Sequence, residues 1–292
     1  MSAGTNICRV LLAAGCLCFP FMLARADTNA PATDIATNSP TATTPQPPSD
    51  AERFFTQYTK AVQLVRQNGR QEASIIMDLL WRNLSSSPWL EIALLKHAEL
   101  NELRNPQVAM DDYDLLRKRV QNAPYFQGTT EHAAVFRAAL LGTVARGIDR
   151  IHILRIRDAL DRYRARYFQY PESLVKLSIF NYIDMGDIYT SSGRLIHYTP
   201  TGQQFTPAIS YQRFDLESLP PEPFYVTSPK IDGTRVDEKT NKYAAILLAP
   251  DRIDFQSVVE GQTLAGYFVA AVDRGGAIVC TPERVLVLLP PS

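Results

Sequence analysis

Hydrophobic and polar residues follow two different rhythms along this chain. Between residues 51 and 145, glycine and proline are few and apolar residues recur every three or four positions, as at Ala61 and Leu64, which is the spacing of one face of an α-helix. From about Glu217 the apolar residues instead form short runs separated by turn residues, which is typical of strands. The pattern therefore predicts an α+β protein with a helical N-terminal domain and a C-terminal β-module.

An internal repeat lies within the helical part. Shifting the chain by 36 residues gives eight identities in the 31 pairs that begin at Tyr58, and self-similarity at a fixed period indicates repeated structural units. Gly69 and Asn105 fall between the two expected helices of each unit, where a turn is needed. An alanine opens the second helix of each unit and a proline closes it, at Ala73, Ala109, Pro88 and Pro124.

This layout resembles the tetratricopeptide repeat, in which a unit consists of a helix, a turn, a second helix with an early alanine, and a terminal proline. The resemblance covers about 75 residues, with a period of 36 where the family has 34 and without the family's aromatic pattern. It implies a concave surface that binds another protein. The alternative is a plain helical bundle that covers the next domain.

One long helix is expected from Ile148 to Tyr170. Residues 146–166, most of which lie in this helix, contain seven arginines and three aspartates, a net charge of +4. These charged residues lie outside the apolar stripe of the helix. Such a helix offers a partner surface, for which Arg155, Arg162 and Arg166 are the candidates, whereas the interleaved aspartates favour a solvated, salt-bridged face. The apolar stripe of the helix is formed by Ile153, Ile156, Leu160, Tyr163 and Tyr167.

The long helix must end near Tyr170, because Pro171 disfavours helical geometry at the residue before it. A short helix follows with Leu174 and Leu177 on one face, and the alternating run 194–198 then predicts a strand in a small meander.

This order, carried by Tyr163, Tyr170, Pro171 and Leu174, resembles the soluble head of G-type pseudopilins of type II secretion and related pilin-like proteins. The resemblance covers about residues 155–207 and implies a pilin-like α/β domain. The chain departs from the family because about 100 helical residues stand where the family has an N-terminal hydrophobic spine. No metal is expected, since Asp184 and Asp187 alone offer too few oxygen ligands for the family's calcium site.

Four apolar runs near the C-terminus predict strands, and Asp273-Arg274-Gly275-Gly276 between two of them predicts a hairpin turn, because glycine supplies positive φ. The segment 259–267 together with the paired strands resembles the periplasmic homology domain of the type II secretion C component and the pilus-assembly P lipoprotein. That resemblance implies contact with secretins. The predicted strands are residues 243–248, 267–272, 277–280 and 285–289.

The N-terminus predicts export. Arg9, an apolar stretch and the small-x-small site before Asp27 are typical of a signal peptide cut between Ala26 and Asp27. The alternative is a lipoprotein modified at Cys16, and a membrane contact is expected only in that case. Cleavage at Ala26 would leave Cys280 as the one cysteine, in a β-rich run where a buried, inert thiol is expected.

The chemistry of the chain predicts no enzyme and no cofactor. Thirty basic residues balance thirty acidic ones, which excludes a global affinity for nucleic acid. Ser173 and Lys176 have the serine-x-x-lysine spacing of penicillin-binding enzymes but lack that family's other motifs. The histidines show no metal-binding spacing and are expected at the surface: His97, His132, His152 and His197.

These observations predict a non-enzymatic scaffold or adaptor of the periplasm or cell envelope, associated with a type II secretion or type IV pilus system. Its expected partners are a secretin, pseudopilins or pilus subunits, with no small-molecule substrate. The alternatives are a periplasmic serine hydrolase acting on cell-wall material and a structural outer-membrane lipoprotein. The expected organisation is a signal peptide (1–26), a Thr/Pro-rich disordered linker (27–50), a helical-repeat domain (51–145), a pilin-like domain (146–216) and a β-module (217–292).

Overall fold

The computed structural model describes residues 47–128, 130–201, 204–205, 208–209, 213–219 and 223–291. The predicted signal peptide, the cleavage site at Ala26 and Asp27, Cys16 and the linker up to residue 46 lie outside the described residues. The described residues belong to one compact unit that begins at Pro47.

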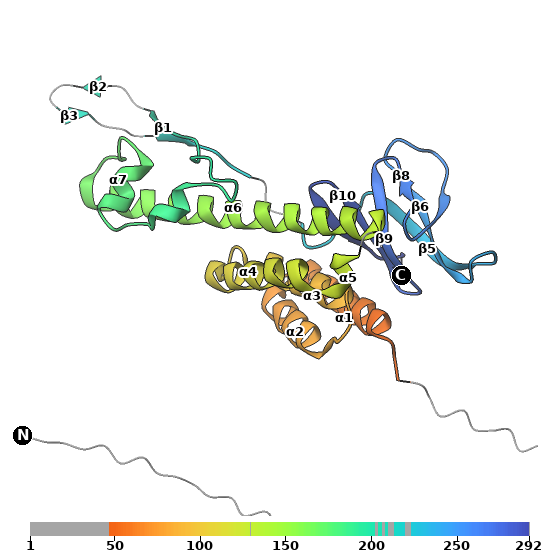
Figure 1. Ribbon diagram of the computed structural model, residues 1–292. Helices are drawn as coiled ribbons and strands as arrows, with labels where there is room; N and C mark the ends of the chain where they lie inside the picture. The colour runs from red at the N-terminus through yellow and green to blue at the C-terminus, as the bar shows by residue number, and fades with distance from the viewer. Residues whose placement is uncertain are drawn as a thin grey trace, which may run out of the picture. The chain divides into compact units, whose positions relative to one another are not determined.

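Helices precede strands along this unit, as expected for the α+β class (Figure 1). The helices are α1 (Asp50–Arg66), α2 (Arg70–Asn83), α3 (Trp89–Asn101), α4 (Pro106–Asn122), α5 (Pro124–Gln127), α6 (Glu131–Tyr167), α7 (Leu174–Ile179) and the 3-10 helix η1 (Met185–Ile188). The strands are β1 (Tyr198–Thr201), β2 (Gln204–Phe205), β3 (Ala208–Ile209), β4 (Arg213–Leu216), β5 (Lys230–Asp237), β6 (Lys242–Leu248), β7 (Gln256–Val259), β8 (Thr263–Leu264), β9 (Tyr267–Asp273), β10 (Gly276–Thr281) and β11 (Arg284–Leu288).

Helices α1 to α4 form two successive hairpins whose second helices begin 36 residues apart. Gly69 and Asn105 are the N-caps of α2 and α4. Ala73 and Ala109 are fully buried one turn later, where a small side chain lets neighbouring helices approach closely. Pro88 is the N-cap of α3 and Pro124 is the first residue of α5, so each proline begins the next helix rather than ending the previous one.

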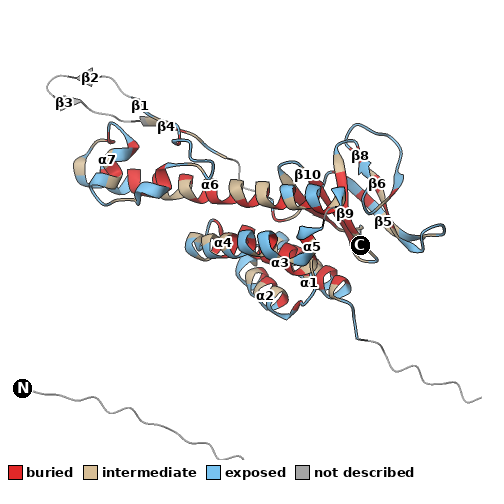
Figure 2. Cartoon of the chain, in the orientation of Figure 1, coloured by how far each residue is buried: buried red, intermediate tan, exposed pale blue. Residues whose placement is uncertain are grey.

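Helix α6 is 37 residues long and continues through the expected domain boundary at residues 145 and 146. The Thr130 side chain caps its N-terminus, and Phe168 ends it in the left-handed conformation at φ 58°. Its first half packs on α4 and on β9 to β11, and its second half packs on α7 and η1. Buried positions therefore recur along the whole helix (Figure 2), and one element joins all three predicted domains.

The segment from Ile153 to Leu216 builds a second core on the end of α6. The residues that carried the pilin-like pattern, Tyr163, Tyr170 and Leu174, are buried there together, and the Tyr198 hydroxyl donates to the Pro171 carbonyl oxygen at 2.7 Å. Strand β1 pairs antiparallel with β4, and β2 with β3. The prediction of a strand over 194–198 was wrong: the run makes one isolated bridge between Leu195 and Tyr189, and β1 begins at Tyr198.

The C-terminal strands form two antiparallel sheets, ordered β5-β6-β7 and β11-β10-β9-β8. Their inner faces share one core, and the other face of β9 to β11 packs on the helices. In β10, for example, Val279 points into the core between the sheets whereas Ile278 and Cys280 belong to the helical core. A strand buried on both faces has a continuous apolar sequence, as in Ala277–Cys280.

The hairpin between β9 and β10 touches α1 directly. A Cβ on Gly275 would lie 2.5 Å from the Cβ of Phe55, so only glycine permits this approach. The Tyr58 hydroxyl adds a 2.6 Å hydrogen bond to the buried Phe224 carbonyl. The first helix and the last sheet are thus parts of one packed body. Within the described ranges, no helix is both long enough and apolar enough to cross a bilayer.

Candidate partner-binding surface

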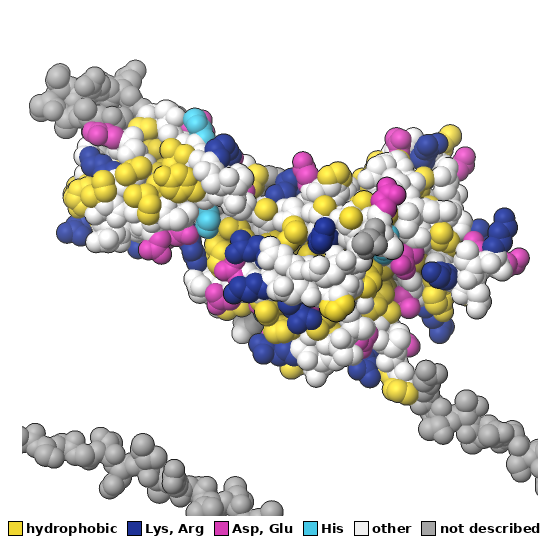
Figure 3. Space-filling model, viewed as in Figure 1, with side chains coloured by type: hydrophobic (Ala, Val, Ile, Leu, Met, Phe, Trp, Pro, Cys, Tyr) yellow, Lys and Arg dark blue, Asp and Glu magenta, His cyan; other side chains and the backbone are white. Residues whose placement is uncertain are grey.

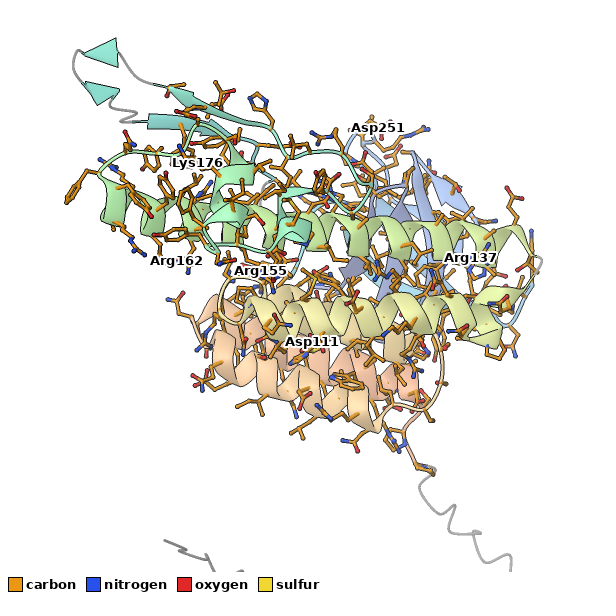
Figure 4. The ribbon with its side chains drawn as sticks, turned by 60° about the vertical axis from the view of Figure 1, so that its left-hand side comes forward. Asp111, Arg137, Arg155, Arg162, Lys176 and Asp251 are labelled. Atoms are coloured by element: carbon orange, nitrogen blue, oxygen red, sulfur yellow. The ribbon has the colours of Figure 1, made fainter. Side chains whose placement is uncertain are left out.

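A polar cleft of about 420 Å³ lies between α4, α6 and the segment 181–187. Two of the three predicted surface arginines, Arg155 and Arg162, line it, while Arg166 lies over the Tyr167 ring instead. Figure 4 shows Arg155 and Arg162 on the side of α6 that faces α4. The predicted grouping of arginines is therefore split between a cleft and the open end of the helix.

Both cleft arginines have partners within the chain. Arg155 donates to Asp187 Oδ1 at 2.9 Å and to Gln107 Oε1 at 2.7 Å, which ties α6 to η1 and α4. Arg162 pairs with Asp158 at 2.9 Å, one helical turn away, and donates to the Tyr182 carbonyl. A ligand entering this cleft must compete with these bonds, which favours a structural role for the two side chains.

A buried network of charged residues on α3 has no counterpart in the sequence-based predictions. Lys96 Nζ lies 2.7 Å from Glu99 Oε2, and both side chains are almost fully buried. One turn later, Glu102 accepts two hydrogen bonds from Arg150 of α6, at 2.8 and 2.6 Å. The Tyr113 hydroxyl of α4 also donates to Glu102. The network thus joins three helices.

Burial raises the pKa of one carboxyl group in this network. Loss of solvent raises the pKa of Glu99 to about 7, although the ammonium group of Lys96 opposes the shift. Burial likewise raises the pKa of Tyr58 and Tyr113, and the Glu99 charge adds to both shifts. At neutral pH, Glu99 therefore exists as a mixture of acid and carboxylate.

The expectation that all four histidines lie at the surface was wrong for His97. Its imidazole is buried, with Nδ1 2.7 Å from Asp112 Oδ2 and Nε2 3.1 Å from the Asn101 amide nitrogen. The reason is that α3 lies between α2 and α4 and has no exposed face from Leu90 to Asn101. A polar side chain on a helix without an exposed face needs a hydrogen-bond partner, and His97 has two.

The remaining candidate residues, Ser173, Lys176 and Cys280, do not line the cleft. Ser173 is the N-cap of α7, and Lys176 extends toward Glu172 at 3.9 Å. Cys280 is buried as predicted, and burial raises the pKa of its thiol. In the part of the chain that the structure describes, no three His, Cys, Asp or Glu side chains are grouped as metal ligands would be.

The outer face of α2 carries an apolar stripe, formed by Ile75 and Leu79. The two residues are one helical turn apart and are 54% and 56% exposed. Leu115 occupies the same repeat position as Leu79 in the second hairpin and is also exposed. An exposed apolar side chain is ordinary when alone, whereas two that lie one turn apart on one helix form a small apolar ridge.

Comparison with protein-family models, with curated proteins and with solved structures finds no match to this chain.

Proposed function

We propose that this protein is a non-enzymatic scaffold of the cell envelope that binds protein components of a type II secretion or type IV pilus system. The observation that carries the proposal is the apolar stripe of Ile75 and Leu79, because it is the exposed ridge of a helical hairpin stack. The sequence resemblances supply the class of partner: a secretin, pseudopilin or pilus subunit.

The packing of the helical hairpins supports a binding role. Helix α3 is buried along its length and braced by charge pairs to α4 and α6, so the outer helix α2 rests on a rigid base. A rigid surface binds with less loss of conformational entropy than a mobile one. A partner helix can therefore dock across α2 through apolar contacts at steps of three and four residues.

The sheets offer a second mode of contact. In the sheet β5-β6-β7, the described strands β5 and β7 each pair on one side only. An edge strand can accept an extended segment through main-chain hydrogen bonds. The half-exposed Val236 on β5 would supply side-chain contact to such a strand.

The test is co-purification of the full chain with envelope proteins from its own source. The variant Ile75→Asp/Leu79→Asp places two charges on the stripe without touching the core, and the proposal expects it to lose the secretin, pseudopilin or pilus subunit that the wild type recovers. Ile253→Asp is the matched control, because Ile253 is 93% exposed on a loop before β7. Equal recovery by all three chains would contradict binding through α2.

A further inference from the structure

The far end of α6 carries an exposed apolar surface, here named the apolar tip and formed by Phe168, Val175, Ile179 and Phe180. Phe168 is 87% exposed and Ile179 is 69% exposed. Hydrophobic side chains gather over α7 and the end of α6 in the space-filling view (Figure 3). A cluster of this kind, unlike scattered single residues, marks a contact surface.

The positions of the tip residues follow from the packing of α7 on the end of α6. Leu174 and Leu177 bury the inner face of α7, whereas Val175 and Ile179 make its outer face apolar as well. The Phe180 ring lies 5.8 Å from the ring of Tyr167, which directly precedes Phe168. Phe168 itself is the C-cap of α6 and holds a positive φ of 58°, which an aromatic residue rarely adopts.

Basic residues surround the tip. Residues 162–180 contain four basic side chains and one acidic one, a net charge of +3. Arg164 and Arg166 lie over the rings of Tyr170 and Tyr167, and among the described residues neither is paired with a carboxylate. Their charge is therefore available to an anionic surface.

The size of the tip argues against a second copy of the chain as its occupant. The two phenylalanines expose on the order of 250 Å², taking about 200 Å² for a whole ring. Even with Val175 and Ile179 added, the tip stays well below the roughly 800 Å² per partner that a stable dimer buries. Apolar side chains ringed by arginine and lysine instead fit the boundary between lipid headgroups and acyl chains.

We propose that the apolar tip inserts into the surface of an anionic lipid bilayer. Phe168, Ile179 and Phe180 enter the headgroup boundary, and Arg164 and Arg166 contact the lipid phosphates. The contact is peripheral and needs no lipid attached to the protein. It is independent of the α2 stripe that binds protein partners.

The experiment places a fluorescent reporter at the tip of the full chain. Phe168→Trp keeps an aromatic ring at position 168, and Ile253→Trp places the same reporter on an exposed loop of the β-module. Trp81 and Trp89 also fluoresce, so the signal is the emission that each variant adds to that of the wild type. With vesicles of phosphatidylcholine and phosphatidylglycerol, the emission added at position 168 is expected to shift to shorter wavelength and to be quenched by brominated lipid. The control reporter is expected to show neither effect, because its loop stays in water.

A second pair of variants measures the strength of the contact. Phe168→Asn suits the positive φ of this position, and with Ile179→Asn it is expected to lower the partition coefficient of the full chain into these vesicles about tenfold or more. Ile253→Asn is expected to leave partitioning unchanged. High salt is expected to weaken wild-type binding.

Three results would overturn the proposal. The first is that the reporter at position 168 stays in water when anionic vesicles are added. The second is that Phe168→Asn/Ile179→Asn partitions into the vesicles as strongly as the wild type. The third is that the wild type forms a dimer that these substitutions dissociate. The last result would assign the tip to a second copy of the chain.

Discussion

Gly147 shows how one missing side chain permits the crossing of α4 and α6. A Cβ at this position would lie 2.3 Å from the Tyr113 ring, so Gly147→Ala must displace a ring that is hydrogen-bonded to Glu102. Helix propensity alone would make alanine stabilising by about 1 kcal/mol. We nevertheless expect a net loss of about 1–3 kcal/mol in the free energy of unfolding, measured by chemical denaturation.

Gly186→Ala is the matched control for this substitution. No atom lies within 4 Å of the Cβ that it would add, so its effect is expected to stay within about 0.5 kcal/mol. An unchanged stability in Gly147→Ala would contradict the crowding at the helix crossing.

The raised pKa of Glu99 predicts that the stability of the protein depends on pH. This pKa is about 7 in the folded protein against an ordinary value of 4.5, so the folded state binds the proton more tightly than the unfolded state. The resulting stability is full below pH 4.5 and is lost as the pH rises to about 7. Relative to Glu99→Gln, the wild type is expected to lose up to about 1.4 kcal/mol per pH unit across this window, measured by urea denaturation.

Glu238→Gln is the control, because Glu238 is an exposed carboxylate in the turn after β5. Its free energy of unfolding is expected to change with pH as steeply as that of the wild type. If Glu99→Gln kept the same slope, burial of Glu99 would not govern this pH dependence.

The burial of a single residue could be predicted where its sequence neighbours are enough to determine it. The burial of Cys280 was predicted because its neighbours are apolar and β-forming. The burial of Lys96, His97 and Glu99 was not predicted, because their sequence neighbours also suit a half-exposed helix. Only the positions of α2 and α4 on both sides of α3 decide that these side chains are enclosed.

At the scale of elements, the pair between Arg150 and Glu102 connects α6 to α3. Arg150→Met leaves the Glu102 carboxylate buried without its cation, and we expect a loss of about 3–5 kcal/mol in the free energy of unfolding. Glu102→Gln added to Arg150→Met removes that charge and keeps an acceptor for Tyr113. The double variant is therefore expected to be more stable than the single one by at least about 1 kcal/mol.

The exposed Arg157 lies on the same helix, and Arg157→Met is expected to change stability by less than about 0.5 kcal/mol. A double variant as unstable as the sum of its two single variants would contradict a direct pair between Arg150 and Glu102.

Elements were predictable where the local pattern and the turn chemistry agree. Periodic apolar residues on both sides of Gly69 and Asn105 located α1 to α4, an apolar stripe located the second half of α6, and glycines located the β9–β10 hairpin. Strand β5 was missed because exposed and charged residues interrupt its apolar pattern. The run 194–198 alternates correctly but lacks a paired strand before Tyr198.

At the scale of the whole molecule, the three expected domains share cores. Phe55, Ile151 and Ile278 belong to one cluster, although they come from α1, α6 and β10 and from three different expected domains. Sequence composition marks changes of secondary structure. The domain boundaries predicted from it are therefore crossed by shared hydrophobic cores. The candidate binding surface was equally out of reach, because the exposure of Ile75 and Leu79 depends on which helices cover α2.

This shared core predicts cooperative unfolding. In a chain with Cys8, Cys16 and Cys18 replaced by serine, Cys280 reports on the sheet, and Trp81 and Trp89 report on the helices. Thiol reactivity and tryptophan emission are expected to change at the same denaturant concentration, since both probes border one core. Two separate midpoints would show that the helices and the sheet unfold independently.

The central claim is that the helical hairpins bind an envelope protein through α2. Its most direct test is titration of the purified full chain, as wild type, Ile75→Asp/Leu79→Asp and Ile253→Asp, with a purified secretin, pseudopilin or pilus subunit from the same source. We predict saturable binding by the wild type and by Ile253→Asp, and a dissociation constant at least about tenfold higher for the α2 variant. Binding of equal strength by all three chains, or by none of them, would contradict the claim.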